Sequence, residues 1–260
     1  MLSYQQVKSY LSHWLLEVDE HSIHSPYFYD LYTKTVAKQN RTDIPKLQEL
    51  RATLLDNETD LSIDDLGSGG KKNPHVIKTI ADIALNSLSP AQVALFYLDL
   101  LNHSQSKRVI ELGTSLGVTS LYLAQKKDAM IYTFEGSHAV ANAAITNFEW
   151  AEQKNIELIE GNIDSTLHRF LEQTKKVDFA LIDANHLYGP TMRYYQQLTK
   201  RLTPKSIIII DDIHRSTEME KAWQEIKTDV FVYGSVDLYR CGILLFDPTL
   251  NKQHFIWSLK

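Results

Sequence analysis

A glycine–serine stretch at residues 113–117, GTSLG, is the part of this 260-residue chain that could most directly do chemistry. Gly113, Ser115 and Gly117 fit the Gly-x-Ser-x-Gly pattern of a nucleophile elbow, in which the serine attacks an ester. The same stretch follows an apolar strand and precedes a helix, where glycines let the backbone approach a nucleotide-like ligand closely. The first interpretation predicts a serine hydrolase. The second predicts a binding loop in which no residue attacks anything.

The hydrolase interpretation also needs an acid and then a histidine later in the chain. Asp183 or Asp211, followed by His214 or His254, satisfies that order. However, an elbow normally follows several strands, whereas the chain before residue 109 has mostly helical patterns and lacks an oxyanion loop of the His-Gly-Gly-Gly type. We therefore favour the binding loop and keep the serine hydrolase as the alternative.

Acidic residues near two strand ends support the binding loop. Glu111 lies in the strand before the loop, and Glu135 closes the next strand, MIYTFE. A carboxylate at the second position can accept hydrogen bonds from two neighbouring ribose hydroxyls. Ser115 stands where the dinucleotide fingerprint Gly-x-Gly-x-x-Gly has its second glycine, which disfavours an NAD enzyme.

The elements that must position these residues alternate from residue 108 onward. Strands are predicted at 108–112, 130–135, 156–160, 179–183 and 206–211, with helices starting near residues 117, 137, 165, 190 and 217. Residues 229–248 indicate two further strands that are antiparallel, because no crossover helix fits between them. The pattern predicts an α/β fold with a doubly wound, mostly parallel, seven-stranded Rossmann-like sheet and a C-terminal antiparallel hairpin.

The first 84 residues predict a helical extension, and residues 85–260 predict the ligand-binding domain. Helical patterns cover 3–20, 46–55, 74–85 and 90–101, and another helix begins at Pro26. The first has one apolar face, formed by residues 7, 10, 11, 14, 15 and 18. We expect this extension to pack on the core as a lid, with HSIHSP (21–26) either facing the ligand or simply starting a helix. The glycine loop at 64–70 is expected near the mouth of the site.

Composition excludes several classes of protein. The formal net charge of −5 argues against a nucleic-acid-binding protein with a broad positive field. The single cysteine, Cys241, excludes an intrachain disulfide and disfavours a cysteine-based zinc site. The N-terminus does not read as a signal peptide, and the apolar runs are too short to span a bilayer. We expect a cytoplasmic protein with neither a nucleic-acid nor a membrane partner; a homodimer stays open.

Five segments taken together are recognisable. They resemble the motif series of class I S-adenosylmethionine-dependent methyltransferases, in particular the catechol O-methyltransferase-like group. The segments are VIELGTSLGVTSLYLA, IYTFEG, IELIEGNID, FALIDANH and SIIIIDDIH. The resemblance covers roughly residues 85–246 and implies S-adenosyl-L-methionine as the cofactor. The cofactor-binding positions that it implies are Glu111, Gly113, Thr114, Ser115, Gly117, Thr119, Glu135, Asn162, Ile163 and Asp183. Leu88 and Ser89 match the same group more weakly.

The resemblance also implies catalytic and metal positions. Members of that group bind a magnesium ion, and the matching residues here are Asp183, Asp211 and Asp212, the last replacing an asparagine. A divalent cation such as Mg therefore stays open. His186 takes the place of a basic lysine and is the candidate general base, and Asp183 with a metal is the alternative for taking the proton. Asp211 is also among the catalytic candidates, and His214 is the second histidine candidate, for orienting the substrate.

These observations predict a methyltransferase that acts on a small-molecule acceptor, at a hydroxyl oxygen in the leading interpretation. A metal-independent N- or carboxyl-methyltransferase on the same fold is the first alternative. The serine hydrolase that uses Ser115 and a non-catalytic cofactor-binding protein are the others.

Overall fold

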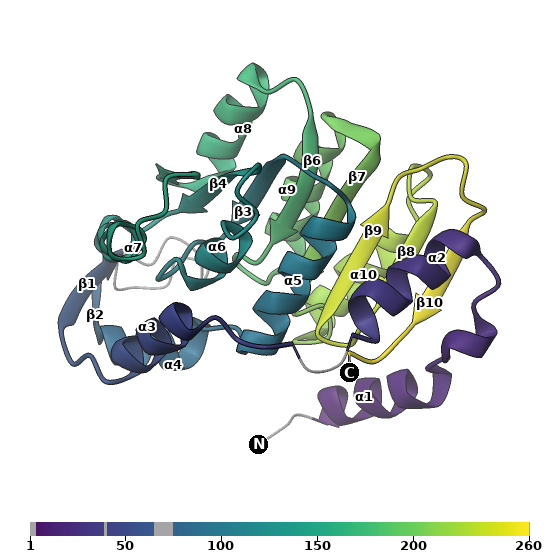
Figure 1. Ribbon diagram of the computed structural model, residues 1–260, viewed down its shortest axis with the longest axis horizontal. Coiled ribbons are helices and arrows are strands. Elements are labelled where there is room, and N and C mark those ends of the chain that lie inside the picture. The colour runs from purple at the N-terminus through teal and green to yellow at the C-terminus, as the bar shows by residue number, and fades with distance from the viewer. Residues whose placement is uncertain (1–3, 39–40, 65–74, 260) are drawn as a thin grey trace.

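The computed structural model of the protein describes residues 4–38, 41–64 and 75–259. An eight-stranded sheet with the order β10-β8-β9-β7-β6-β3-β4-β5 forms its centre (Figure 1). The strands are β3 (Arg108–Leu112), β4 (Met130–Glu135), β5 (Ile156–Glu160), β6 (Val177–Ile182), β7 (Leu202–Asp211), β8 (Gly234–Asp237), β9 (Cys241–Leu245) and β10 (Gln253–Ile256). Only β9 runs against its neighbours, so the mostly parallel sheet and its antiparallel hairpin are confirmed.

Helices cover both faces of the sheet. They are α5 (Ala91–His103), α6 (Val118–Leu123), α7 (His138–Trp150), α8 (Ile163–Gln173), α9 (Tyr188–Thr199) and α10 (Thr217–Lys227). Side chains alternate along the strands, so that Val109 and Phe179 pack toward α5 while Ile110 and Ala180 pack toward α8, α9 and α10. Because both faces are buried, the central strands read as continuous apolar runs. The doubly wound class is thereby confirmed.

Two strands differ from the prediction. Residues 253–256 add β10, an eighth strand parallel to β8, where seven strands were expected. Residues 75–79 form β2 (His75–Thr79), antiparallel to β1 (Asp60–Asp64), whereas a helix was predicted over 74–85. The β-branched residues of HVIKT favour a strand, and Thr79 then caps α4 (Ile80–Ser87) through a capping box. The expected domain boundary at residue 84 therefore falls inside α4.

Of the N-terminal helices, the first two lie beside the C-terminal strands, whereas the third packs on α4 and α6 (Figure 1). They are α1 (Tyr4–Leu16), α2 (Pro26–Leu31) with the π-helical turn Tyr32–Val36, and α3 (Pro45–Leu55). Phe28 of α2 packs on Phe255 with ring centroids 4.8 Å apart, and Val18 N donates to Ile256 O at 2.9 Å. None of the helices in the described ranges is both long enough and apolar enough to span a bilayer.

Candidate active site at the carboxyl edge of the sheet

A cavity of about 490 Å³ lies at the carboxyl ends of the parallel strands. Its walls come from the segments that follow β3, β4, β5, β6 and β7 and from the turn between β8 and β9. Here the chain order reverses, because β3 continues to β4 and β5 on one side while β6 and β7 lie on the other. Open α/β sheets bind their ligands at such a switch point, and the volume is in the range of small-molecule sites.

The glycine loop forms the wall at the switch point. Gly113 has a φ of +105°, and a Cβ there would come within 2.3 Å of the backbone oxygen of Asp183. Any side chain at this position would therefore force β3 and β6 apart. Gly117 has a φ of +77°, and its Cβ would lie 2.4 Å from the Phe148 ring, so this glycine serves helix packing and does not line the cavity. Thr114, Ser115 and Thr119 do line it.

Glu135 connects the loop to the next strand. Its carboxylate accepts hydrogen bonds from Ser115 N and Ser137 N, each at 2.9 Å. Burial raises the pKa of Glu135, and the backbone N–H donors at Ser137 and Ser115 oppose that effect. The side chain lines the cavity and retains lone pairs for a ligand hydroxyl.

Glu111 lies beneath the loop and does not line the cavity. Ser120 Oγ and Thr133 Oγ1 both donate to its carboxylate, and only 1% of the residue is exposed. Burial raises the pKa of Glu111 to about 7, which those two hydroxyl donors only partly oppose. The geometry gives Glu111 a part in holding the loop, and its contact with a cofactor stays a prediction.

Ser115 lacks the partners of a catalytic serine. Its Oγ lies 2.7 Å from Ser87 Oγ, and no hydrogen bond to a histidine or carboxylate side chain involves this hydroxyl among the described residues. The Ser115 backbone N–H points to Glu135, as in a binding loop. The nucleophile-elbow interpretation is therefore not supported, because activation of a serine needs a base within hydrogen-bond reach.

The segment after β5 closes the same side of the cavity. Asn162 caps α8 by accepting a hydrogen bond from Asp164 N at 2.9 Å, and both Asn162 and the mostly buried Ile163 line the cavity. Asp164 also lines it and is paired with Arg193 at 2.9 Å. An apolar side chain beside polar groups suits a flat, partly polar ring such as adenine.

The opposite wall holds the candidate base. His186 Nε2 lies 3.6 Å from Asp183 Oδ1, and His186 Nδ1 lies 3.9 Å from Asp212 Oδ2. Both distances exceed a hydrogen bond but allow ion pairing once the imidazole is protonated. Burial lowers the pKa of His186, although Asp212 opposes the shift. Burial and the neighbouring carboxylates of Asp211 and Asp212 raise the pKa of Asp183 well above its ordinary value.

Unusual backbone conformations concentrate at this cavity. Seven described residues other than glycine have positive φ, and four of them line the cavity: Ser115, Asn185, His186 and Asp212. Each such conformation costs about 1–3 kcal/mol and persists where the surrounding structure enforces it. The clustering marks the cavity as the candidate functional site.

The expected metal ligands do not form a metal site. Asp211 is fully buried, and its Oδ2 accepts a hydrogen bond from Arg240 Nη2 at 3.1 Å. Asp212 is paired with Arg215 Nη1 at 3.0 Å. Within the described ranges no group of three or more His, Cys, Asp or Glu side chains could hold a metal ion. Two of the three carboxylates implied for magnesium, those of Asp211 and Asp212, are thus already paired with arginines, and the described residues do not fit that ion.

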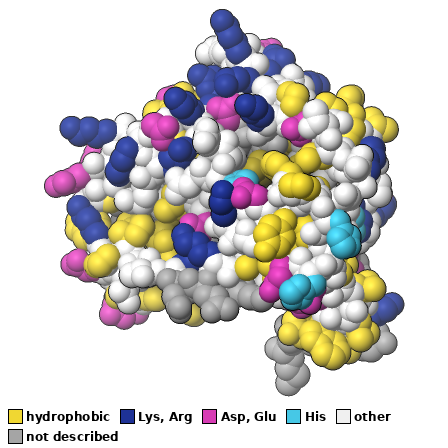
Figure 2. All heavy atoms as spheres, turned by 45° about the vertical axis from the view of Figure 1, so that its right-hand side comes forward, with side chains coloured by type: hydrophobic (Ala, Val, Ile, Leu, Met, Phe, Trp, Pro, Cys, Tyr) yellow, Lys and Arg dark blue, Asp and Glu magenta, His cyan; other side chains and the backbone are white. Residues whose placement is uncertain are grey.

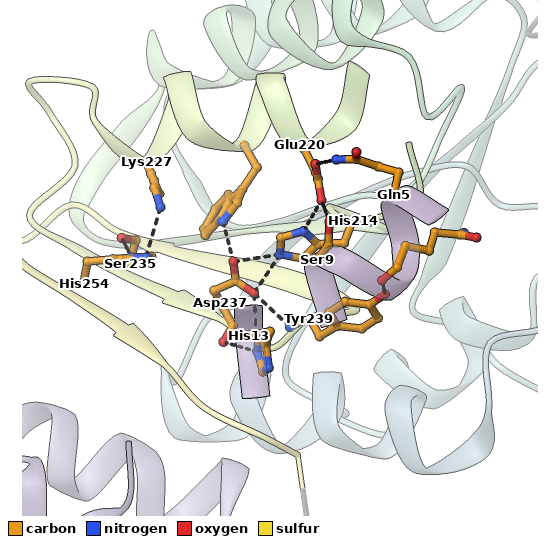
Figure 3. A network of polar contacts seen from close by, with 12 residues as sticks. Gln5, Ser9, His13, His214, Glu220, Lys227, Ser235, Asp237, Tyr239 and His254 are labelled. Atoms are coloured by element: carbon orange, nitrogen blue, oxygen red, sulfur yellow. Dashed lines mark hydrogen bonds and ion pairs between the residues drawn. The ribbon is translucent and has the colours of Figure 1, made fainter. Parts of the chain in front are cut away.

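His214 belongs to a different part of the molecule. Its two ring nitrogens contact Glu220 and Asp237, each at 2.9 Å (Figure 3). It lines a second cavity of about 410 Å³ beneath α1, together with Ser9 and His13 of that helix. The predicted role of His214 in orienting a substrate is therefore not supported, because both nitrogens are engaged away from the main cavity.

The described residues that line the main cavity begin at Ile63, so α1, α2 and α3 do not cover it. His21 follows Asp19, which caps a short 3-10 turn, and Pro26 begins α2 at its first position. The structure places HSIHSP at a helix start beside the C-terminal strands, not in a lid. Most of the glycine loop at 64–70 lies outside the described residues.

Sequence reasoning missed several cavity residues. They include Arg215 after β7 and Arg240 in the turn between β8 and β9. They also include three residues of α4, namely Asp82, Asn86 and Ser87. Ser89, matched only weakly beforehand, also lines it. A signal for Arg240 was its place in the turn of the predicted hairpin, since turns beside the carboxyl edge of the sheet face the ligand.

Comparisons with known proteins agree with this geometry. Residues 110–213 match the model of a methyltransferase domain family. A search of curated proteins finds no match. Among solved structures, an O-methyltransferase from Bacillus cereus in complex with SAH (S-adenosylhomocysteine) has a TM-score of 0.58 and 18% identity, with 83% of this chain and 99% of that chain covered.

Two further solved structures have the same fold. The SAH-bound methyltransferase PaMTH1 from Podospora anserina has a TM-score of 0.55 and 15% identity, with coverage of 80% of this chain and 98% of that chain. The O-methyltransferase TomG from Streptomyces achromogenes, involved in tomaymycin synthesis and in complex with SAM, has a TM-score of 0.53 and 17% identity, with coverage of 62% and 82%. At these identities the likeness concerns the fold.

Proposed function

We propose that the protein transfers a methyl group from S-adenosylmethionine to a hydroxyl oxygen of a small molecule, because residues 110–213 match the model of a methyltransferase domain family and the chain has the class I S-adenosylmethionine-dependent methyltransferase fold. One observation carries the proposal: a single cavity joins a nucleoside-type wall, with the glycine loop and Glu135, to a wall with His186. The solved structures with SAM or SAH support the choice of cofactor.

The cofactor side of the cavity has the chemistry that a nucleoside with an amino-acid tail requires. Glu135 has free lone pairs for the ribose hydroxyls, Ile163 offers an apolar surface for the base, and Gly113 keeps side-chain atoms away from the switch point. When bound, S-adenosylmethionine supplies a methyl group on a positively charged sulfur, which makes the methyl carbon electrophilic.

The chain's own contribution is to align the acceptor and to take its proton. The lowered pKa of His186 keeps its imidazole neutral at pH 7, so that it can accept that proton. Asp212 then stabilises the imidazolium across 3.9 Å. A neutral imidazole ionises a phenol-type hydroxyl, with a pKa of about 10, far more readily than a water-like hydroxyl of about 16. A phenol-type acceptor therefore fits best.

Calorimetric titration with S-adenosylhomocysteine tests the cofactor assignment. Glu135→Gln should weaken binding by about tenfold or more, because a charge-assisted hydrogen bond to the ribose is lost. Glu160→Gln is the matched control, since Glu160 ends the neighbouring strand β5 and does not line the cavity. Absence of binding to the wild-type protein would refute the proposal. Acceptor panels of phenols, carboxylic acids and amines, followed by S-adenosylhomocysteine release, then test the reaction.

A carboxyl methyltransferase is the second candidate. Arg215 and Arg240 both line the acceptor end, and a guanidinium binds a carboxylate well. The same arginines disfavour a cationic amine. Turnover of carboxylic acids but not of phenols in the acceptor panel would favour this candidate.

A further inference from the structure

Arg240 brings a fixed positive charge into the acceptor end of the main cavity. We propose that its guanidinium binds the ionised oxygen of the acceptor. It would thereby take the place of the divalent cation that the catechol O-methyltransferase-like group uses. The proposal rests on the methyl-transfer function proposed above. It assigns a role to a residue that no motif of the sequence identified.

The position of Arg240 is fixed from several directions. Its Nη2 donates to Asp211 Oδ2 at 3.1 Å and to Ser89 Oγ at 3.2 Å. Its backbone N donates to Leu238 O at 2.7 Å, and its backbone O accepts from Ile213 N at 3.1 Å. These bonds connect the β8–β9 turn to the segment after β7 and to the N-terminal end of α5. The guanidinium is therefore pre-organised and loses little freedom when it binds a ligand.

The guanidinium also has donors left for a ligand. Its side chain is 37% exposed and lines the cavity together with Asp183, His186 and Asp212. Its Nε is buried and has no hydrogen-bond partner among the described residues. The described contacts use only Nη2 for side-chain bonding, whereas a guanidinium carries five N–H donors. Because Nε is buried, an acceptor oxygen in this part of the cavity would meet the permanently charged guanidinium through Nη1.

The neighbouring carboxylates explain why a permanently charged arginine side chain lies at this position. Asp211 is fully buried and would be costly as an isolated anion, so Arg240 is its counterion. A magnesium ion at the same carboxylate would have to displace the guanidinium or lie beside it, against charge repulsion. The chain thus carries, as a side chain, the positive charge that the related sites obtain from an ion.

The test uses 4-nitrophenol, whose absorbance reports ionisation, with the full-length protein saturated with S-adenosylhomocysteine and treated with EDTA. Wild-type protein should bind the nitrophenolate form and lower the apparent pKa of the probe. Arg240→Met alone would leave Asp211 unpaired and could unfold the chain, so the variants are Arg240→Lys and the double variant Arg240→Met with Asp211→Asn. Arg169→Met, on the exposed face of α8, is the control.

The double variant should weaken nitrophenolate binding by about tenfold to a hundredfold, and the lysine variant should lie between it and the wild type. Affinity for S-adenosylhomocysteine should change by less than about threefold in all variants, since the described side-chain contacts of Arg240 involve neither Glu135 nor the glycine loop. Unchanged nitrophenolate binding in the double variant, no binding by the wild type, or a more than tenfold gain on adding Mg²⁺ would overturn the proposal. Loss of S-adenosylhomocysteine binding by the wild type would instead refute the cofactor assignment.

Discussion

His186 and His214 have the same local sequence setting but opposite surroundings. Each follows by three residues an aspartate at the carboxyl end of a parallel strand, Asp183 for β6 and Asp211 for β7. His186 has no ring hydrogen bond to a described residue and lines the main cavity. His214 has carboxylates on both ring nitrogens at 2.9 Å. The three-residue spacing from an aspartate is the same for both histidines. Only the contacts of the ring nitrogens distinguish His186, a candidate general base, from His214, which has a structural role.

The network around His214 holds α1 through the polar side of that helix. Gln5 and Ser9 donate to Glu220, and His13 lies 3.6 Å from Asp237 (Figure 3). Asp237 also accepts hydrogen bonds from Trp223 Nε1 and Tyr239 N, each at 2.9 Å. Tyr239 precedes Arg240, so the network also supports the turn that carries Arg240. The region around His214 is thus structural support for the region around His186.

The largest expected effect is on catalysis. His186→Ala should lower kcat by about 10²–10⁴-fold, because general-base assistance is lost, while S-adenosylhomocysteine affinity stays nearly unchanged. His168→Ala is the matched control, since His168 is exposed on α8. Steady-state kinetics with the best acceptor of the panel provide the measurement. A normal kcat for His186→Ala would remove the distinction between the two histidines.

The next effect is on stability. Asp237→Asn should lower the free energy of unfolding by about 3 kcal/mol, because a buried carboxylate paired with His214 becomes neutral. Urea denaturation followed by tryptophan fluorescence measures it. An equal loss for Glu160→Gln, whose carboxylate is 44% exposed, would show that the method does not resolve the network.

His214→Gln should have a smaller effect, and on stability more than on chemistry. We expect a loss of about 1–2 kcal/mol in the free energy of unfolding, since two hydrogen bonds to carboxylates are weakened. The kcat should fall by less than about tenfold, through the support that the network gives to the Arg240 turn. A loss of kcat as large as that of His186→Ala would place His214 in the chemistry and contradict the comparison.

The pH dependence should separate the two histidines most finely. Burial lowers the pKa of His186 below its ordinary value of about 6.5, so the neutral, basic form of the imidazole persists to lower pH than usual. The rate should therefore rise with pH only below about 6.5. Burial opposes protonation of His214, but Asp237 and Glu220 outweigh it and raise the pKa of His214. Stability from His214 is therefore fully present below its unfolded pKa, and it is lost as pH rises through the raised value.

Urea titrations of wild type and His214→Gln at several pH values test this sign. The stability difference between them should shrink as pH rises through the raised pKa of His214. A difference that grows with pH would mean that His214 is held neutral, as His186 is.

The apolar strands of this chain could largely be predicted, because burial on both faces produces short, continuous runs such as IIII at 207–210. However, β6 begins two residues and β7 four residues before the predicted starts at 179 and 206. The strand at 75–79 and β10 could not be predicted, since each is short and depends on its partner strand. Among site residues, Glu135 follows from a strand end, and His186 follows from the resemblance to the methyltransferase motifs. Arg240 is brought to the cavity by a hairpin turn, and only tertiary structure reveals its ion pair with Asp211.

For the first helix, α1, the sequence did not predict which face is buried. Its apolar face was expected to pack on the core, yet Trp14 is 62% exposed and Leu15 is 72% exposed. Figure 2 shows apolar side chains gathered at the lowest part of the molecule, which is the level of α1 in Figure 1. The buried side of α1 is polar because Glu220 and Asp237 provide its partners. Periodicity predicts that a helix forms, but the chemistry of the docking surface decides which face is buried.

A crystal structure with S-adenosylhomocysteine tests the central claim most directly, namely that the cavity at the switch point between β3 and β6 is the cofactor site. The account predicts ribose hydroxyls on the Glu135 carboxylate and the sulfur facing the space between Asp183, His186 and Arg240. Binding of the nucleoside in the cavity beneath α1, or with its sulfur turned away from His186, would contradict the account.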